Sequence, residues 1–237
     1  EIKRAKSKQP HLSTINFQDD SFLALPYDQL QDFAKLYKEQ VKIPFVVCGV
    51  IPNYVREDKI ALLVEAGMNR VRMGIQSGSD NILEFYKRPT KLHRIKEATE
   101  ILNKFDKYMI PPSYDIILEN PVEKINDTRA TVDMIYEMPR PYTLNVYALR
   151  VIPNTIMAKQ IEDRGLKVPP IDKNFFIDYR RTLGNILVFA LTIWKIPKWL
   201  YKILRKRVYP VQDKQPSYPI LFWIVRMIYL VKRAFNH

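Results

Sequence analysis

Five short strand-like segments alternate with helix-like stretches, and this alternation is the sequence feature that most constrains the fold. The strand-like segments are residues 13–18, 44–48, 70–76, 113–118 and 143–149. Pro26 stands where a helix can begin, and Gly67 where one can end. Ile95, Ala98, Ile101 and Phe105 recur at helical spacing on one face. A repeated βα order predicts an α/β fold with a parallel sheet and crossover helices, open or closed as a barrel.

Several of the strand-like segments carry polar side chains on one face. The alternating positions concerned are Asn16, Gln18, Arg72, Gln76, Asp115, Asn145 and Tyr147. A buried polar group without a partner costs about 1–3 kcal/mol, so rows of them do not suit a dry core. We therefore predict that these faces line a lumen that binds a polar ligand. Antiparallel strands with one solvated face are the alternative, and the long helical connections argue against them.

Positive charge is concentrated in the last quarter of the chain. The net charge is +13, and residues 175–237 contribute 12 Lys and Arg against 2 acidic residues. The uneven distribution predicts two regions with different partners. The single cysteine, Cys48, excludes an internal disulfide framework and a metal site made of several cysteines. It also favours a reducing, cytoplasmic setting.

The basic region has a helical pattern that is interrupted by prolines. Its apolar stretches, residues 184–194 and 219–231, are shorter than the roughly 20 residues of a spanning helix. Residues 198–205 combine basic side chains (Lys198, Lys202, Arg205) with Trp199 and Ile203. Such a segment can lie on an anionic membrane or hold a lipid-like substrate, so residues 180–235 are a candidate peripheral membrane surface. A helical cap that packs on the barrel or on another domain is the alternative. Nucleic acid is a third partner class, but no recognition motif accompanies the charge.

Four motifs in order resemble a known family. They are FQDDSF (17–22), GMNRVRMGIQSGSDNILEFYKR (67–88), SYDIILENPVEK (113–124) and IPNT (152–155), the last before a helix that ends at Gly165. Together they resemble the second half of the radical S-adenosylmethionine (SAM) core, most closely in the branch whose core follows a cobalamin-binding domain. The resemblance implies a partial parallel (β/α) TIM-like barrel. It predicts a core over residues 1–170 without its first strand and cluster loop, and a basic helical extension over residues 171–237.

The resemblance also assigns roles to individual residues. Gln76 matches a position that bonds the SAM ribose, and Asp115 matches the acid that accepts bonds from the ribose hydroxyls. Arg88 matches a position that holds the methionyl carboxylate, and Asp19 and Asp20 match the acidic motif near the methionyl pocket. A carboxylate can accept both hydroxyls of a diol, and a guanidinium suits a carboxylate through bidentate bonds.

Each assignment has a structural alternative. Arg88 could be a surface arginine that ends a helix, and Gln76 could cap the turn at residues 77–79. Asp19 and Asp20 could cap the helix that starts near Pro26. Asp115 is harder to explain otherwise, because an acid within an apolar strand needs a partner. Glu123 matches a family acid for which we expect a structural role.

Two departures from the family pattern are informative. The family holds a 4Fe-4S cluster with three cysteines in a CxxxCxxC loop, and this chain has only Cys48, which we expect to be a small core residue. The cluster ligands, and any cobalamin-binding domain, are therefore expected in a missing N-terminal part. The common pattern also has glycine at the positions of Glu119 and Val122.

The resemblance therefore implies the SAM-binding portion of a radical SAM enzyme, which we expect to be inactive alone. The expected chemistry is reductive cleavage of SAM to a 5′-deoxyadenosyl radical, with cobalamin-assisted methyl transfer or cyclisation as a further expectation. One rival is another barrel enzyme acting on a sugar or phosphorylated substrate. A second rival is a non-catalytic protein that binds a membrane surface or a partner.

Overall fold

The computed structural model describes residues 2–9, 11–88, 90–166 and 179–235. Its contacts divide the chain into two compact units. The first comprises Glu1–Ile75, His93–Tyr114 and Pro139–Thr143, and the second comprises Gln76–Leu92, Asp115–Met138 and Leu144–His237. The predicted boundary between residues 170 and 171 lies outside the described residues and stays a prediction.

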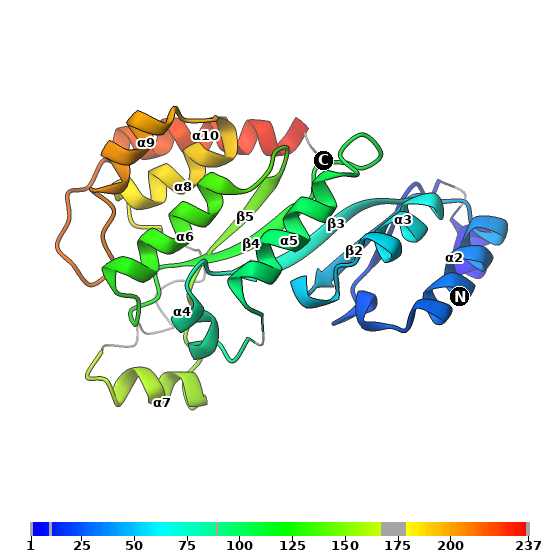
Figure 1. The fold of residues 1–237 in the computed structure, drawn as a ribbon, viewed down its shortest axis with the longest axis horizontal. Coiled ribbons are helices and arrows are strands. Elements are labelled where there is room, and N and C mark those ends of the chain that lie inside the picture. Colours follow the sequence, from blue (N-terminus) through cyan, green and yellow to red (C-terminus); the bar gives the residue numbers. More distant parts are fainter. Residues whose placement is uncertain (1, 10, 89, 167–178, 236–237) are drawn as a thin grey trace. The chain divides into compact units, whose positions relative to one another are not determined.

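The five predicted strands are present and form one sheet (Figure 1). They are β1 (Ile15–Phe17), β2 (Phe45–Val50), β3 (Met68–Gln76), β4 (Ser113–Leu118) and β5 (Thr143–Ala148). The strand order follows the chain, β1-β2-β3-β4-β5. The β1–β2 and β2–β3 pairs are parallel, with Phe17 opposite Val47 and Val47 opposite Val71. These pairs confirm the parallel arrangement and exclude the antiparallel alternative for them.

Helices follow the strands, as the alternation predicts. The described α-helices are α1 (Ile2–Lys8), α2 (Tyr27–Gln40), α3 (Glu57–Glu65), α4 (Asp80–Phe85), α5 (Leu92–Asn103), α6 (Ile125–Glu137), α7 (Ile156–Glu162), α8 (Leu183–Ile193), α9 (Lys198–Arg205) and α10 (Pro219–Phe235). Pro26 is the N-cap residue of α2, and Gly67 has a φ of 109° directly after α3. None of the described helices combines the length and the apolar content that crossing a bilayer requires.

The first unit has an aromatic core between β1, β2 and α2. Phe17, Phe33, Tyr37 and Phe45 contact one another with ring centroids 4.7–6.1 Å apart, and Phe22 joins them through Phe17 and Phe33. Cys48 lies within β2 and is 6% exposed, which confirms it as a core residue.

The predicted two-faced pattern of β3 is present. Val71, Met73 and Ile75 are at most 1% exposed, whereas Arg72 and Gln76 are half-buried. One face of the strand is therefore a dry core face, and the other carries the polar positions.

The C-terminal helices belong to the second unit and pack on its other elements. α8 is buried along almost its whole length and contacts α6, α9 and α10 (Figure 1). Tyr201 of α9 stacks on Tyr136 of α6, and Asp133 of α6 accepts a hydrogen bond from Tyr201 at 2.5 Å and pairs with Arg205. The alternative of a packed helical cap therefore describes α8. Arg205 belongs to this contact and not to a basic stripe with the exposed Lys198 and Lys202.

Two tyrosines of the extension hydrogen-bond to β5, the last strand of the sheet. The Tyr229 hydroxyl donates to the Leu144 carbonyl at 2.5 Å, and the Tyr179 hydroxyl donates to the Val146 carbonyl. An edge strand exposes unpaired backbone groups, and these hydroxyls satisfy two of its carbonyls. The extension is therefore an integral part of the second unit.

Candidate functional site

The loop after β3 is held tightly against α6. The Thr131 hydroxyl accepts from the Gly78 N–H at 3.0 Å and shares a hydrogen bond with Ser77 at 3.1 Å. The Ser79 hydroxyl donates to Asp127 at 2.5 Å. A Cβ on Gly78 would lie 2.6 Å from the Ala130 carbonyl oxygen, so this close approach requires glycine. The loop is thereby fixed at the carboxyl end of β3.

Gln76 is the last residue of β3 and stands directly before this loop. It is half-buried and has a φ of 71°, which is uncommon for a residue other than glycine. The turn that follows takes its side-chain hydrogen bonds from Ser77 and Thr131, since the Ser77 hydroxyl accepts from the Ser79 N–H at 3.1 Å. These bonds cap the turn at residues 77–79, which was the alternative role considered for Gln76. Its role as a ribose ligand stays a prediction.

Asp115 occupies the polar face of β4. Its neighbours Tyr114 and Ile116 are buried on the opposite face, at 1% and 0% exposure, while Asp115 is half-buried. The Asn145 amide of β5 donates to Asp115 Oδ1 at 2.7 Å. A carboxylate has about four lone-pair sites, so this bond is compatible with accepting further bonds from a diol. The structure thus brings together two polar positions that lie 30 residues apart.

Arg88 is exposed and follows the end of α4. Its backbone N–H donates to the Leu83 carbonyl at 2.8 Å, and the preceding Lys87 has a φ of 54°. This position agrees with the alternative of an exposed arginine at a helix end. Binding of a methionyl carboxylate by Arg88 stays a prediction.

Asp19 and Asp20 belong to the first unit and are exposed in the loop after β1. A Cβ on Gly49 would lie 2.6 Å from the Asp19 carbonyl oxygen, and Gly49 has a φ of 68°. The glycine therefore lets this loop approach the end of β2 closely. The capping alternative is wrong, because the N-cap residue of α2 is Pro26 and no side chain caps it. The contribution of Asp19 and Asp20 to SAM binding stays a prediction.

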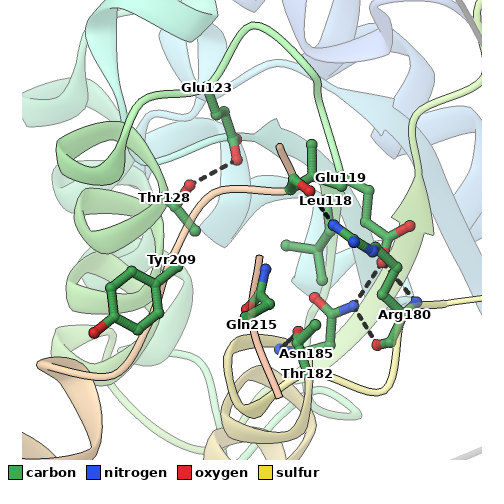
Figure 2. Close-up of a pocket in the computed structure, with 10 residues that line it drawn as sticks. Leu118, Glu119, Glu123, Thr128, Arg180, Thr182, Asn185, Tyr209 and Gln215 are labelled. Atoms are coloured by element: carbon green, nitrogen blue, oxygen red, sulfur yellow. Dashed lines mark hydrogen bonds between the residues drawn. The ribbon is translucent and has the colours of Figure 1, made fainter. Parts of the chain in front are cut away.

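A small pocket lies between the loop after β4 and the C-terminal extension (Figure 2). Its lining residues are Leu118, Glu119, Glu123, Thr128, Arg180, Thr182, Asn185, Tyr209, Val211 and Gln215. Asp115, Gln76 and Arg88 are not among them. The pocket is therefore a feature separate from the predicted SAM residues.

Glu119 fixes the N-terminal end of α8 at this pocket. Its Oε1 accepts from the Arg180 backbone N–H and from the Asn185 side-chain amide, both at 2.7 Å (Figure 2). Glu119 has a φ of 63°, a conformation that glycine adopts without strain. Replacement of the family glycine thus leaves the positive φ in place and adds a carboxylate that holds the extension. Sequence reasoning noted the departure but missed this contact.

Glu123 is buried at the same pocket. It is 4% exposed, and its Oε2 accepts from the Thr128 hydroxyl at 3.0 Å (Figure 2). The pKa of Glu123 is raised to about 7: burial raises it most, the Thr128 hydrogen bond lowers it, and the nearby Asp127 raises it. The Glu123 backbone carbonyl accepts from the Gln212 amide at 2.5 Å. These contacts agree with the structural role expected for this acid.

The comparisons with known proteins identify one family. The model of the Radical SAM superfamily matches residues 1–135, which is more than half of the chain. The heme chaperone HemW of Bacillus subtilis (strain 168) is 22% identical over 174 residues, which cover 70% of this chain and 44% of HemW. The chain therefore spans less than half the length of this curated relative.

Solved structures of radical SAM enzymes share the fold at low sequence identity. The cobalamin-dependent SAM radical enzyme OxsB, with aqua-cobalamin bound, has a TM-score of 0.63 at 13% identity, covering 100% of this chain and 50% of OxsB. Coproporphyrinogen III oxidase (HemN) from Escherichia coli has a TM-score of 0.54 at 20% identity, covering 73% of this chain and 41% of HemN. The methyltransferase TsrM from Kitasatospora setae, with cobalamin and a [4Fe-4S] cluster bound, has a TM-score of 0.55 at 16% identity, covering 72% of this chain and 34% of TsrM. These neighbours confirm the α/β fold of the TIM-like radical SAM type, and the chain belongs to the Radical SAM superfamily.

Proposed function

We propose that this chain is the SAM-binding portion of a radical SAM enzyme and that Asp115 holds the ribose of SAM. One observation carries the proposal: Asp115 is a half-buried carboxylate on the polar face of β4, held by the buried Asn145 amide at 2.7 Å. A carboxylate can accept both hydroxyls of a diol, which is the group that the ribose of SAM offers.

The donor set in the second unit fits SAM. Asp115 offers carboxylate oxygens to the two ribose hydroxyls, and Gln76 offers an amide at the end of the preceding strand. Arg88 carries a guanidinium on an exposed side chain after α4, and a guanidinium suits the methionyl carboxylate through bidentate bonds. Asp19 and Asp20 belong to the first unit, and we propose that they contribute to the methionyl pocket.

When bound, a 4Fe-4S cluster would supply the electron for reductive cleavage of SAM to methionine and a 5′-deoxyadenosyl radical. The chain contains one cysteine, and Cys48 is buried. We therefore propose that cysteines outside these 237 residues hold the cluster, and that this chain alone does not cleave SAM. Its own residues bind SAM and fix its orientation.

Equilibrium dialysis of the 237-residue chain with radiolabelled SAM tests the assignment. A hydrogen bond to a charged group contributes about 1.5–3 kcal/mol, so Asp115→Asn should raise the dissociation constant about 10- to 150-fold. Asp58→Asn is the matched control, because Asp58 is an exposed carboxylate that pairs with Arg56. Undetectable binding by the unsubstituted chain, or equal affinity in Asp115→Asn, would contradict the proposal.

Cobalamin is a finer part of the proposal. OxsB and TsrM bind cobalamin, and we propose that the protein containing this chain uses it for methyl transfer or cyclisation at an unreactive carbon. Cobalamin absorbance in the purified, cluster-containing protein would support this part, and its absence after reconstitution would remove it without affecting the SAM assignment. The family match favours this chemistry over a sugar- or phosphate-binding barrel enzyme of another class.

A further inference from the structure

α10 is apolar on both of its sides. Its inner residues Phe222, Val225 and Tyr229 are at most 6% exposed, and the rings of Phe222 and Tyr229 contact Phe189 of α8 at centroid distances of 5.8 and 4.9 Å. Its outer side carries exposed large apolar residues: Ile220, Leu221, Trp223, Ile224, Met227, Ile228, Leu230, Val231 and Phe235. A helix that is apolar all round is normally buried, so we expect the outer side of α10 to be covered.

The exposed residues of α10 form one continuous surface. Ile220, Ile224, Met227, Val231 and Phe235 recur at intervals of three or four, so they line up along the helix. Their exposed fractions range from 51% to 87%. Single exposed apolar residues are ordinary, whereas a contiguous row marks an interaction site.

The charged side chains of α10 lie away from this row. Arg226 is half-buried, with its guanidinium 5.0 Å from the centroid of the Tyr179 ring. Lys232 donates to the Thr192 and Ile193 carbonyls at the C-terminal end of α8, and Arg233 donates to the hydroxyl of the inner residue Tyr229 at 3.4 Å. The exposed row itself therefore consists of uncharged, apolar residues.

Basic side chains are concentrated in the same C-terminal segment as the apolar row. Residues 183–235 contain ten Lys and Arg and one acid, Asp213. The exposed ones are Lys195, Lys198, Lys202, Lys206, Arg207 and Lys214. The two Lys232 hydrogen bonds fix the C-terminal end of α10 beside the C-terminal end of α8. From the end of α8 the chain continues through Trp194 and Lys195 into α9. On α9, Trp199 and Ile203 are 66% and 50% exposed, between these lysines.

We propose that the outer row of α10, together with the exposed lysines around α9, is a docking surface for an anionic lipid bilayer. The helix lies in the plane of the membrane surface, because its inner side is packed on α8. Apolar and Trp side chains enter the boundary between headgroups and acyl chains, and the lysines contact anionic headgroups. A second copy of the chain is a poorer occupant, since it would bring two strongly basic surfaces together. The proposal is independent of SAM binding.

Co-sedimentation of the 237-residue chain with vesicles tests the surface. Replacing about a third of phosphatidylcholine by phosphatidylserine should strengthen binding at least tenfold, since the exposed lysines are attracted to an anionic surface. Salt at about 1 M, where the Debye length is about 3 Å, should return binding to the level of neutral vesicles.

A double substitution separates the apolar row from the overall charge. Ile224→Glu with Met227→Glu places two carboxylates on exposed positions of the row and should weaken binding at least tenfold. Leu36→Glu with Tyr108→Glu is the matched control: it adds the same charge at positions that are 53% and 70% exposed in the first unit. The control variant should bind nearly as well as the unsubstituted chain.

Three outcomes would overturn the proposal. Equal binding to neutral and anionic vesicles would remove the role of the lysines. Equal loss of binding in the two double variants would show that net charge alone decides. A dimer in solution that dissociates in the α10 variant, without vesicle binding, would assign the row to a second copy.

Discussion

The buried carboxyl group of Glu123 makes the stability of the protein depend on pH. Its pKa is about 7 in the folded chain, because burial disfavours the charged form, against 4.5 for an exposed glutamate. The difference of roughly 2.5 units corresponds to about 3 kcal/mol at about 1.36 kcal/mol per unit. Between these two values the folded state binds more protons than the unfolded state. The free energy of unfolding should therefore fall as pH rises from about 4.5 to 7, and the full cost should apply above pH 7.

Glu123→Gln removes this ionisation while keeping the shape and an acceptor for the Thr128 hydroxyl. The added amide costs about 1–3 kcal/mol if it finds no partner, but that cost does not vary with pH. The free energy of unfolding of the Gln variant minus that of the unsubstituted chain should therefore rise by about 3 kcal/mol between pH 4.5 and pH 8. The test depends on the rise of this free-energy difference with pH and not on its absolute value.

Urea unfolding followed by circular dichroism and tryptophan fluorescence measures the difference. The three tryptophans lie at positions 194, 199 and 223, within the same unit as Glu123, so fluorescence reports on that unit. Glu84→Gln, at an exposed position of α4, is the matched control and should show no such rise. A difference for Glu123→Gln that stays constant from pH 5 to 8 would refute the reasoning.

Two further substitutions test the loops that follow β3 and β4. Glu119→Gly relieves the strain of a φ of 63°, which stabilises the fold by about 1 kcal/mol. The variant also loses the two hydrogen bonds that the carboxylate accepts, one of them from Asn185, and each contributes about 1.5–3 kcal/mol. The variant should be net destabilised in urea unfolding, and an equal or higher stability would show that the carboxylate does not hold α8. Gly78→Ala places a Cβ 2.6 Å from the Ala130 carbonyl oxygen and should cost about 2 kcal/mol or more. Gly165→Ala is the control, because nothing lies within 4 Å of the added Cβ, and it should cost about 1 kcal/mol for its φ of 69° alone. Equal thermal stability of the two variants would contradict the close packing at Gly78.

The sequence predicts the strands well because alternation carries the information. Residues 113–118 were predicted as a strand and form β4 with the same bounds, since buried Tyr114 and Ile116 frame the polar Asp115. Residues 13–18 shorten to Ile15–Phe17, because β1 pairs only with the first part of β2. Helix ends at Pro26 and Gly67 also follow from local chemistry, namely a fixed φ and a positive φ.

Contacts between distant segments could not be predicted in the same way. Glu119 contacts Asn185, which lies 66 residues later in the chain, and no local pattern indicates this. Arg205 was expected in an exposed basic stripe and instead pairs with Asp133 at 2.5 Å, because α9 packs on α6. The alternation placed Asp115 and Asn145 each on a polar strand face, but their hydrogen bond depends on which strands are neighbours in the sheet.

The geometry of the ribose site tests the central claim most directly. It can be measured by solving the structure of the cluster-containing protein with SAM bound. We predict that the 2′- and 3′-hydroxyls of the ribose lie about 2.5–3.0 Å from the Asp115 carboxylate oxygens, the range of an O–H···O hydrogen bond. A ribose bound elsewhere, with Asp115 contacting only side chains of the protein, would contradict it.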